Sequence, residues 1–299
     1  MNILVLGGGN IKGAFEVGVI SAINTRFAPD MIAGTSVGAL NAAYLVDALG
    51  RGASYRTACR SLVGFWAENV TGFSSIARMR SWPELALRYL FRQWSGLVSM
   101  EKLYSIVAAN IKKENLQASP LKLLVTAVDL HSGKLRVYTD DDADIIDAII
   151  ASTAIPVEMA YRTIGDDVLV DGGLRAVLPI GAAMAQAAEW NWSVDDLLAV
   201  STYPLNAGEY RDIDEGNPIS ILERSIEILL AKQHIDSLPE IARIADGAKR
   251  FEMISPRFLL DQVFGFNFFN FTSEHIKKMM DEGEKVARED LEKNDYRIF

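Results

Sequence analysis

The chain has 299 residues, of which 49% are hydrophobic, and its formal net charge is −9. This length suits a single large domain with enough apolar material for a core. The acidic balance argues against nucleic acid as a partner and against general attraction to anionic membranes, and it leaves room only for a local basic patch. Cys59 is the only cysteine, so no internal disulfide can form and a reducing cytoplasm is the expected location.

Short apolar runs alternate with glycine turns and helical patterns over the first 50 residues. Residues 3–6 are expected to form a buried strand rather than part of a signal peptide, and residues 14–24 a helix. A second strand at 31–33 and a second helix at 37–49 follow. This alternation predicts an α/β fold with a mainly parallel sheet.

The rest of the chain reads as elements added to this sheet within one domain, residues 1–299. An aromatic-rich insertion over about 54–116 is expected to be mainly helical. Strands are predicted at 121–128, 134–139, 168–170 and 197–201, with a helix at 144–151. Residues 203–271 predict a helical and hydrophobic cap with helices at 219–231 and 241–251, and a last helix is expected to begin near Ser273.

Residues 34–38 have the form Gly-x-Ser-x-Gly and lie between a predicted strand and a predicted helix. This context is typical of a nucleophile elbow, a sharp turn that exposes one serine hydroxyl above the end of a sheet. Gly34 and Gly38 would be required because a side chain at either position would clash with the adjoining strand and helix. Ser36 is therefore the candidate nucleophile for covalent acyl chemistry.

A glycine-rich loop at residues 7–13 precedes the elbow and could bind an anion through backbone N–H groups. A phosphate loop would require Ser or Thr after the lysine, but Lys12 is followed by Gly13. The glycine spacing also departs from the dinucleotide pattern. An oxyanion hole for acyl transfer remains, and it accounts for a serine elbow nearby.

Few residues could act as the base that activates Ser36, because the chain has only three histidines. His131 falls in a predicted hairpin turn, and His234 and His275 fall on predicted helices, where we expect solvated surface positions. His275 is the one candidate for a conventional triad, since the histidine comes last in that order. Asp171 is the stronger candidate base because it ends an apolar strand and precedes Gly172-Gly173.

Taken together and in order, four motifs resemble those of the patatin-like phospholipases, over about residues 1–205 and the last helix. They are the glycine loop at 8–13, the elbow at 34–38, the small-residue turn ending in proline at 151–156, and Asp171-Gly172-Gly173. The resemblance implies a three-layer α/β/α sandwich that hydrolyses lipid esters without a metal or organic cofactor. It implies a catalytic dyad of Ser36 and Asp171, an oxyanion hole at Gly8, Gly9 and Asn10, and supporting positions Lys12, Gly13, Gly34, Gly38, Gly172 and Gly173.

One position departs from the family pattern, because Asn10 stands where the loop usually has its third glycine. Asparagine tolerates positive φ better than other non-glycine residues, so the loop is expected to survive. Lys12 is expected to brace the loop or to meet a phosphate head group. Two alternatives remain open: a conventional α/β-hydrolase esterase that uses His275, and a catalytically weak lipid- or partner-binding protein on the same fold.

A lipid hydrolase must reach an ester at an interface, and two aromatic segments could serve this purpose. They are residues 65–94 and residues 258–271. Most of these aromatic side chains are expected to fill the core. Residues 265–269 are the better candidate for a lid or interface, since their polar breaks make a buried element less natural. We therefore expect a cytoplasmic protein that acts peripherally on a membrane surface.

Overall fold

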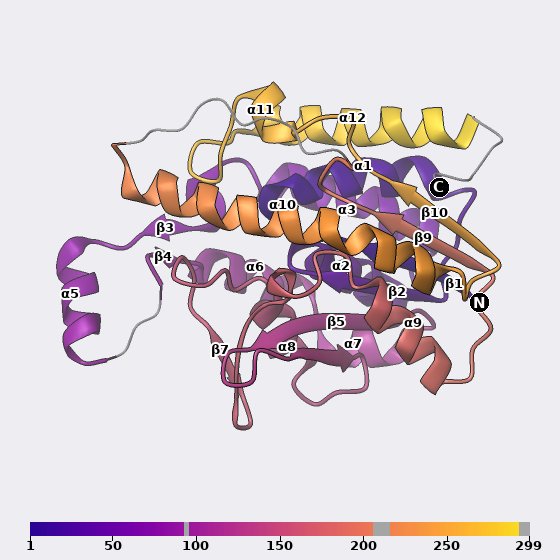
Figure 1. Cartoon of the computed structure of the whole chain (residues 1–299), viewed down its shortest axis with the longest axis horizontal. Coiled ribbons are helices and arrows are strands. Elements are labelled where there is room, and N and C mark those ends of the chain that lie inside the picture. The colour runs from indigo at the N-terminus through magenta and orange to yellow at the C-terminus, as the bar shows by residue number, and fades with distance from the viewer. Residues whose placement is uncertain (93–95, 206–215, 293–299) are drawn as a thin grey trace.

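The computed structural model describes residues 1–92, 96–205 and 216–292, and in it a mostly parallel sheet lies between two layers of helices (Figure 1). This confirms the predicted three-layer fold. The described sheet has eight strands in the order β10-β9-β1-β2-β5-β8-β7, with β6 paired to β5. The strands are β1 (Asn2–Leu6), β2 (Met31–Thr35), β5 (Lys122–Asp129), β6 (Leu135–Thr139), β7 (Arg162–Ile164), β8 (Asp167–Asp171), β9 (Asp196–Val200) and β10 (Arg250–Ile254).

The two faces of the sheet are covered by different helices. Leu4 and Leu6 pack with one layer and Ile3 and Val5 with the other, as the pleat of a strand requires. Strands buried on both faces are apolar throughout, which explains the continuous apolar run of β1. The first layer contains α1 (Gly13–Ile23), α2 (Val37–Gly50), α3 (Tyr55–Asn69) and α12 (Ser273–Glu292), and the second α9 (Ile180–Glu189) and α10 (Pro218–Ala245).

Two strands share one edge of β5 and meet end to end. Along that edge, β2 pairs in parallel with residues 122–126 of β5, and β8 pairs antiparallel with residues 127–129. The same β5 residues 124–128 pair with β6, which must therefore occupy the opposite edge. The last residues of β2 and β8, Thr35 and Asp171, therefore pair with consecutive residues of β5, Thr126 and Ala127. The C-terminal ends of the two strands consequently meet at this point of the sheet.

The insertion at 54–116 is mainly helical, as predicted, and it also contains a short two-stranded ribbon. Helix α5 projects from this ribbon, away from the body of the molecule (Figure 1). Trp66 is buried, whereas Trp82 is exposed, and Trp94 lies outside the described residues. Besides α3, the insertion comprises α4 (Phe73–Ile76), β3 (Arg78–Met79), α5 (Trp82–Leu90), β4 (Val98–Ser99), α6 (Glu101–Asn110) and α7 (Lys113–Ala118).

Two expectations for the cap region are wrong. The helix predicted at 241–251 is wrong at its end, because α10 stops at Ala245 and residues 250–254 form β10 at the sheet edge. Side chains of β10 pack into both layers beside β9. Phe266, Phe268 and Phe271 are buried rather than exposed, so this segment packs onto the core after α11 (Leu260–Phe264). Residues 206–215 of the expected cap lie outside the described residues.

The last helix agrees with the prediction. α12 begins at Ser273 and buries Ile276, Met279 and Ala287, and it packs along α1. Among the described residues, no helix combines the length and apolar character needed to cross a bilayer. The described part of the chain also contains no group of three or more His, Cys, Asp or Glu side chains placed to hold a metal ion.

Candidate active site

Ser36 occupies the sharp turn between β2 and α2, with φ 56° and ψ −126°. Positive φ is strained for a serine and is typical of a nucleophile elbow. A Cβ on Gly34 would lie 2.5 Å from the backbone of Gly38, and one on Gly38 would lie 2.5 Å from the Leu6 carbonyl oxygen. The flanking glycines are therefore sterically required, as predicted.

Asp171 is the last residue of β8 and contacts Ser36 directly. The Ser36 hydroxyl donates a 2.6 Å hydrogen bond to Asp171 Oδ2, and the Gly173 N–H donates to Oδ1 at 2.7 Å. Burial raises the Asp171 pKa to about 6, although these two hydrogen bonds act to lower it. The structure thus brings together the two residues predicted as a dyad, with no group between them.

The small-residue turn at 151–156 holds both partners. Ser152, at the end of α8 (Ile145–Ser152), accepts a 2.7 Å hydrogen bond from the Ser36 N–H through its hydroxyl. The carbonyl of Ala154 accepts one from the Asp171 N–H at 2.9 Å. Both serine and aspartate are therefore fixed through their backbones to the same turn.

The glycine loop lines the same pocket as Ser36 and Asp171. The Gly8 N–H donates to the Val177 carbonyl at 2.9 Å, so Gly8 is not the available oxyanion donor that we expected. No acceptor among the described residues is found for the N–H groups of Gly9 and Asn10. Asn10 adopts φ 56°, so it takes up the backbone conformation that glycine would favour.

Thr202 fixes the path of this loop from the neighbouring strand end. Its hydroxyl donates to the Gly8 carbonyl oxygen, and any Cβ on Gly9 would overlap the Thr202 side chain. Glycine at position 9 is therefore required by the close approach of residue 202, which follows β9. Gly9 and Asn10 both line the pocket that contains Ser36 and Asp171.

Lys12 follows the loop in the short helix η1 (Asn10–Lys12) and is buried. Its ammonium group pairs with Glu227 of α10 and lies 4.3 Å from the centre of the Tyr203 ring. Burial alone would lower the Lys12 pKa, but Glu227, Tyr203 and Asp261 together outweigh it, and the pKa lies well above its ordinary value. This ion pair links the loop to α10. Bracing of the loop was one of the two roles expected for Lys12, the other being contact with a phosphate head group.

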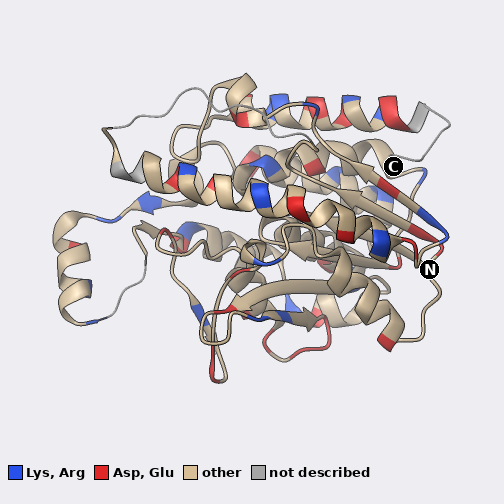
Figure 2. Cartoon of the chain, viewed as in Figure 1, with Lys and Arg blue, Asp and Glu red and all other residues tan. Residues whose placement is uncertain are grey.

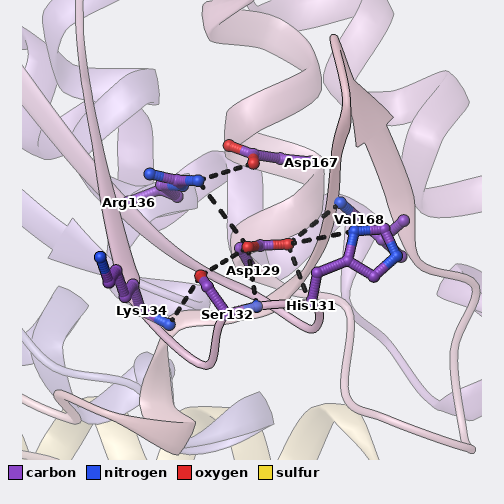
Figure 3. A network of polar contacts seen from close by, with 7 residues as sticks. All are labelled: Asp129, His131, Ser132, Lys134, Arg136, Asp167 and Val168. Carbon is purple, nitrogen blue, oxygen red and sulfur yellow. Dashed lines mark hydrogen bonds and ion pairs between the residues drawn. The ribbon is translucent and has the colours of Figure 1, made fainter.

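The histidines lie away from the pocket that holds Ser36. His131 lies in the exposed β5–β6 turn, where Asp129 accepts hydrogen bonds from the backbone N–H groups of His131 and Ser132 (Figure 3). His234 is fully buried rather than solvated as we expected, and burial lowers its pKa to about 4. His275 Nδ1 accepts from the Thr272 N–H at 3.2 Å, so this nitrogen is occupied locally.

Two cavities meet at Ser36 and share Asn10, Ile155 and Phe268 in their walls. We call the first the polar cavity, because its walls carry charged side chains. Burial, followed by the nearby Glu223 carboxylate, raises the pKa of Glu158 in this wall to about 7. The second, the apolar cavity, runs between α2, α3 and α6, and its lining includes Leu40, Phe65, Trp66, Leu103 and Val107.

Three residues of the site carried no individual prediction. Ser152 lies in a segment singled out only for its small residues, and Thr202 and Glu227 come from regions without a motif. Their roles depend on contacts between segments as many as 215 residues apart in the chain. Only the small-residue turn offered a sequence signal that could have identified one of them.

A family model described as patatin-like phospholipase matches residues 4–184, from β1 to α9. Uncharacterized NTE family proteins of Mycobacterium bovis and Mycobacterium tuberculosis are each 29% identical to this chain over 224 residues. The aligned part is 75% of this chain and 55% of each relative. The chain therefore spans about half the length of the curated relatives it matches.

Two solved bacterial structures are distantly similar in shape. VipD from Legionella pneumophila matches 97% of this chain and 66% of its own, with a TM-score of 0.42 at 13% identity. The type III effector ExoU of Pseudomonas aeruginosa matches 97% of this chain and 52% of its own, with a TM-score of 0.36 at 12% identity. Likeness at this level has no bearing on activity.

Proposed function

The chain belongs to the patatin-like phospholipase family, and on that premise we propose that it hydrolyses carboxylic esters of lipids through an acyl intermediate on Ser36. The observation that carries the proposal is the 2.6 Å hydrogen bond from Ser36 Oγ to Asp171 Oδ2 in a buried site. A nucleophile hydrogen-bonded directly to a carboxylate is the arrangement that general-base activation requires.

In the first half of the reaction, Asp171 Oδ2 takes the proton of Ser36 Oγ as Oγ attacks the ester carbonyl carbon. The pKa of about 6 makes Asp171 a stronger base than an ordinary aspartate of pKa 3.8. The carbonyl oxygen becomes an oxyanion that accepts from the N–H groups of Gly9 and Asn10. The intermediate then expels the alcohol, which takes the proton from Asp171 and leaves an ester of the acyl group with Ser36.

The second half of the reaction repeats these steps with water. Asp171 takes a proton from a water molecule, and the resulting hydroxide attacks the acyl carbon. Collapse of this second oxyanion breaks the bond to Ser36 Oγ, which recovers its proton from Asp171 as the fatty acid leaves. The dyad returns to its starting state, and two protein residues perform every proton transfer.

The two cavities that meet at Ser36 support a division of the substrate into its two parts. We assign the acyl chain to the apolar cavity, since burying each methylene there is worth about 0.8 kcal/mol. The alcohol part then lies in the polar cavity beside Lys12 and Glu158. The ester bond would lie at Ser36, where the walls of both cavities coincide.

Neither alternative function gains support from an observation at the site. A conventional triad would need a histidine at Ser36, but His275 lines neither cavity and its Nδ1 is bonded to the Thr272 N–H. The idea of a weak binding protein rested on Asn10, whose positive φ keeps the loop in the expected conformation.

Two measurements test the proposal. Hydrolysis of a panel of phospholipids, monoacylglycerols and water-soluble esters should be lost in Ser36→Ala and Asp171→Asn. Labelling with a fluorophosphonate followed by peptide mass spectrometry should place the adduct on Ser36. Turnover at the wild-type rate in both variants would refute the mechanism. Absence of an adduct together with absence of hydrolysis would instead favour a binding protein.

A further inference from the structure

Helix α5 and the residues around it carry the most exposed cluster of large apolar side chains on the described chain. We call residues 78–92, which comprise β3, α5 and the turn on either side, the α5 arm. No described helix or strand packs along α5, which projects beyond the other elements (Figure 1). Its exposed apolar side chains are Trp82 (84%), Tyr89 (78%), Leu90 (73%), Phe91 (63%) and Leu87 (57%).

The charge of the α5 arm is opposite to that of the rest of the chain. The arm has four arginines and one glutamate, a net charge of +3, while the whole chain carries −9. The remaining residues therefore sum to −12, and in Figure 2 acidic residues are distributed over the body of the molecule, interspersed with basic ones. Helix α5 itself is neutral, with Glu84 and Arg88, and the excess positive charge comes from the segments that flank it, where Arg78 and Arg92 are exposed and Arg80 is buried. Positive charge on a projecting aromatic arm indicates an anionic partner.

The arginines and the apolar side chains form one amphipathic unit. Arg78 and Arg88 pair with Glu84 at 3.0 and 3.5 Å, and the buried Arg80 pairs with the same carboxylate. These arginines outnumber the glutamate, so the cluster keeps excess positive charge beside the aromatic side chains. Aromatic residues with nearby arginines are the composition of helices that lie in the interfacial region of a lipid bilayer.

The base of the arm is connected to the wall of the active site. The Arg80 N–H donates to the Leu97 carbonyl at 3.0 Å, and the Val98 N–H donates to the Glu158 carbonyl at 2.8 Å. Glu158 lines the polar cavity that opens at Ser36. The side chains of Val157 and Tyr161, close to Glu158 in sequence, are about half exposed.

We propose that the α5 arm docks the protein on an anionic lipid surface, with its aromatic side chains in the interfacial region and Arg78, Arg88 and Arg92 on the lipid head groups. The proposal rests on the proposed function, because a lipid hydrolase must hold its active site against the bilayer that contains the substrate. We propose this arm as the contact with the membrane in place of residues 265–269, because Phe266 and Phe268 are buried. Docking here would place the entrance of the polar cavity beside the bilayer.

Vesicle binding by Ser36→Ala protein tests docking without any turnover. The protein should cosediment with phosphatidylcholine vesicles that contain phosphatidylserine, and much less with phosphatidylcholine alone. The double variant Trp82→Ser/Phe91→Ser should bind on the order of tenfold more weakly. Arg88→Gln/Arg92→Gln should lose about fivefold per arginine on the anionic vesicles, and this loss should vanish at high salt.

The matched control is Ile228→Ser/Leu229→Ser, which removes two exposed apolar side chains of α10. This control should bind like the parent, and hydrolysis of a water-soluble ester should be unchanged in the Trp82/Phe91 variant made in active protein. Equal vesicle binding by the arm and control variants would overturn the proposal. A second outcome would also overturn it: arm variants that change from dimer to monomer but still bind vesicles. The arm would then be a contact with a second copy of the chain.

Discussion

Replacing Asp171 with asparagine should abolish hydrolysis and, at neutral pH, stabilise the fold. Asparagine has nearly the same shape, so its Oδ1 can still accept from the Gly173 N–H and its Nδ2 can donate to the Ser36 hydroxyl. It cannot take a proton from Ser36, and the loss of a general base typically costs about 10²- to 10⁴-fold in rate. The variant also removes a buried negative charge.

The magnitude follows from the pKa of Asp171, which burial raises from 3.8 to about 6. Each tenfold change in a protonation equilibrium is worth about 1.36 kcal/mol, so this rise corresponds to about 3 kcal/mol. The folded protein binds this proton more tightly than the unfolded chain does, so the free energy of unfolding falls as pH rises from about 4 to about 7. The asparagine side chain does not titrate, so the variant should escape that fall.

The assay is urea unfolding of wild type and Asp171→Asn across this pH range. The stability of the variant relative to wild type should increase by about 3 kcal/mol between about pH 4 and pH 7. Glu158 and Glu252, whose pKa values burial also raises to about 7, are present in both proteins and cancel in the difference. Asp166→Asn, at an exposed position in the turn before β8, controls for the loss of one negative charge. A relative stability that does not change with pH would refute the reasoning.

Four further outcomes are expected. The value of kcat/KM should rise with pH through about 6, because Asp171 acts only as a carboxylate; a pH-independent profile would contradict this. His275→Gln should keep full activity on a soluble ester, and its loss would favour a triad. Gly9→Ala should lose about 10²-fold or more in kcat with the fold retained by circular dichroism, since its Cβ would displace the loop from Thr202. Leu103→Trp should slow cleavage of long-chain esters but spare short-chain ones, and an equal effect on both would remove the acyl chain from the apolar cavity.

The sequence predicted the order of the main elements well, because each depends on local patterns. Continuous apolar runs, helical spacing of apolar residues and the glycine turns located β1, β2, α1 and α2 to within a few residues. The helix predicted at 241–251 ran past the end of α10 at Ala245, because residues 250–254 become an edge strand only when β9 lies beside them. His234 was misjudged for the same reason, because burial is decided by the elements packed over it.

The exposure of aromatic side chains could be decided only by packing. Residues 65–94 and 258–271 have similar composition, yet Phe268 lies against the core while Trp82 and Phe91 project into solvent. Periodicity within either segment does not reveal which one has a partner surface. Whether a backbone N–H group is available as a donor also depends on the tertiary structure. The Gly8 N–H already donates to the Val177 carbonyl, which belongs to a segment distant in sequence.

The sequence by itself located the parts of the candidate site: a serine on an elbow, an aspartate at a strand end and a glycine loop. These features are local, because each needs only a few consecutive residues to impose its backbone conformation. Only the tertiary structure decided that the two side chains meet. β2 and β8 share one edge of β5 from opposite directions, and this pairing brings Ser36 and Asp171, which lie 135 residues apart in sequence, within 2.6 Å. Strand pairing over such a separation depends on the whole sheet, and no local pattern encodes it.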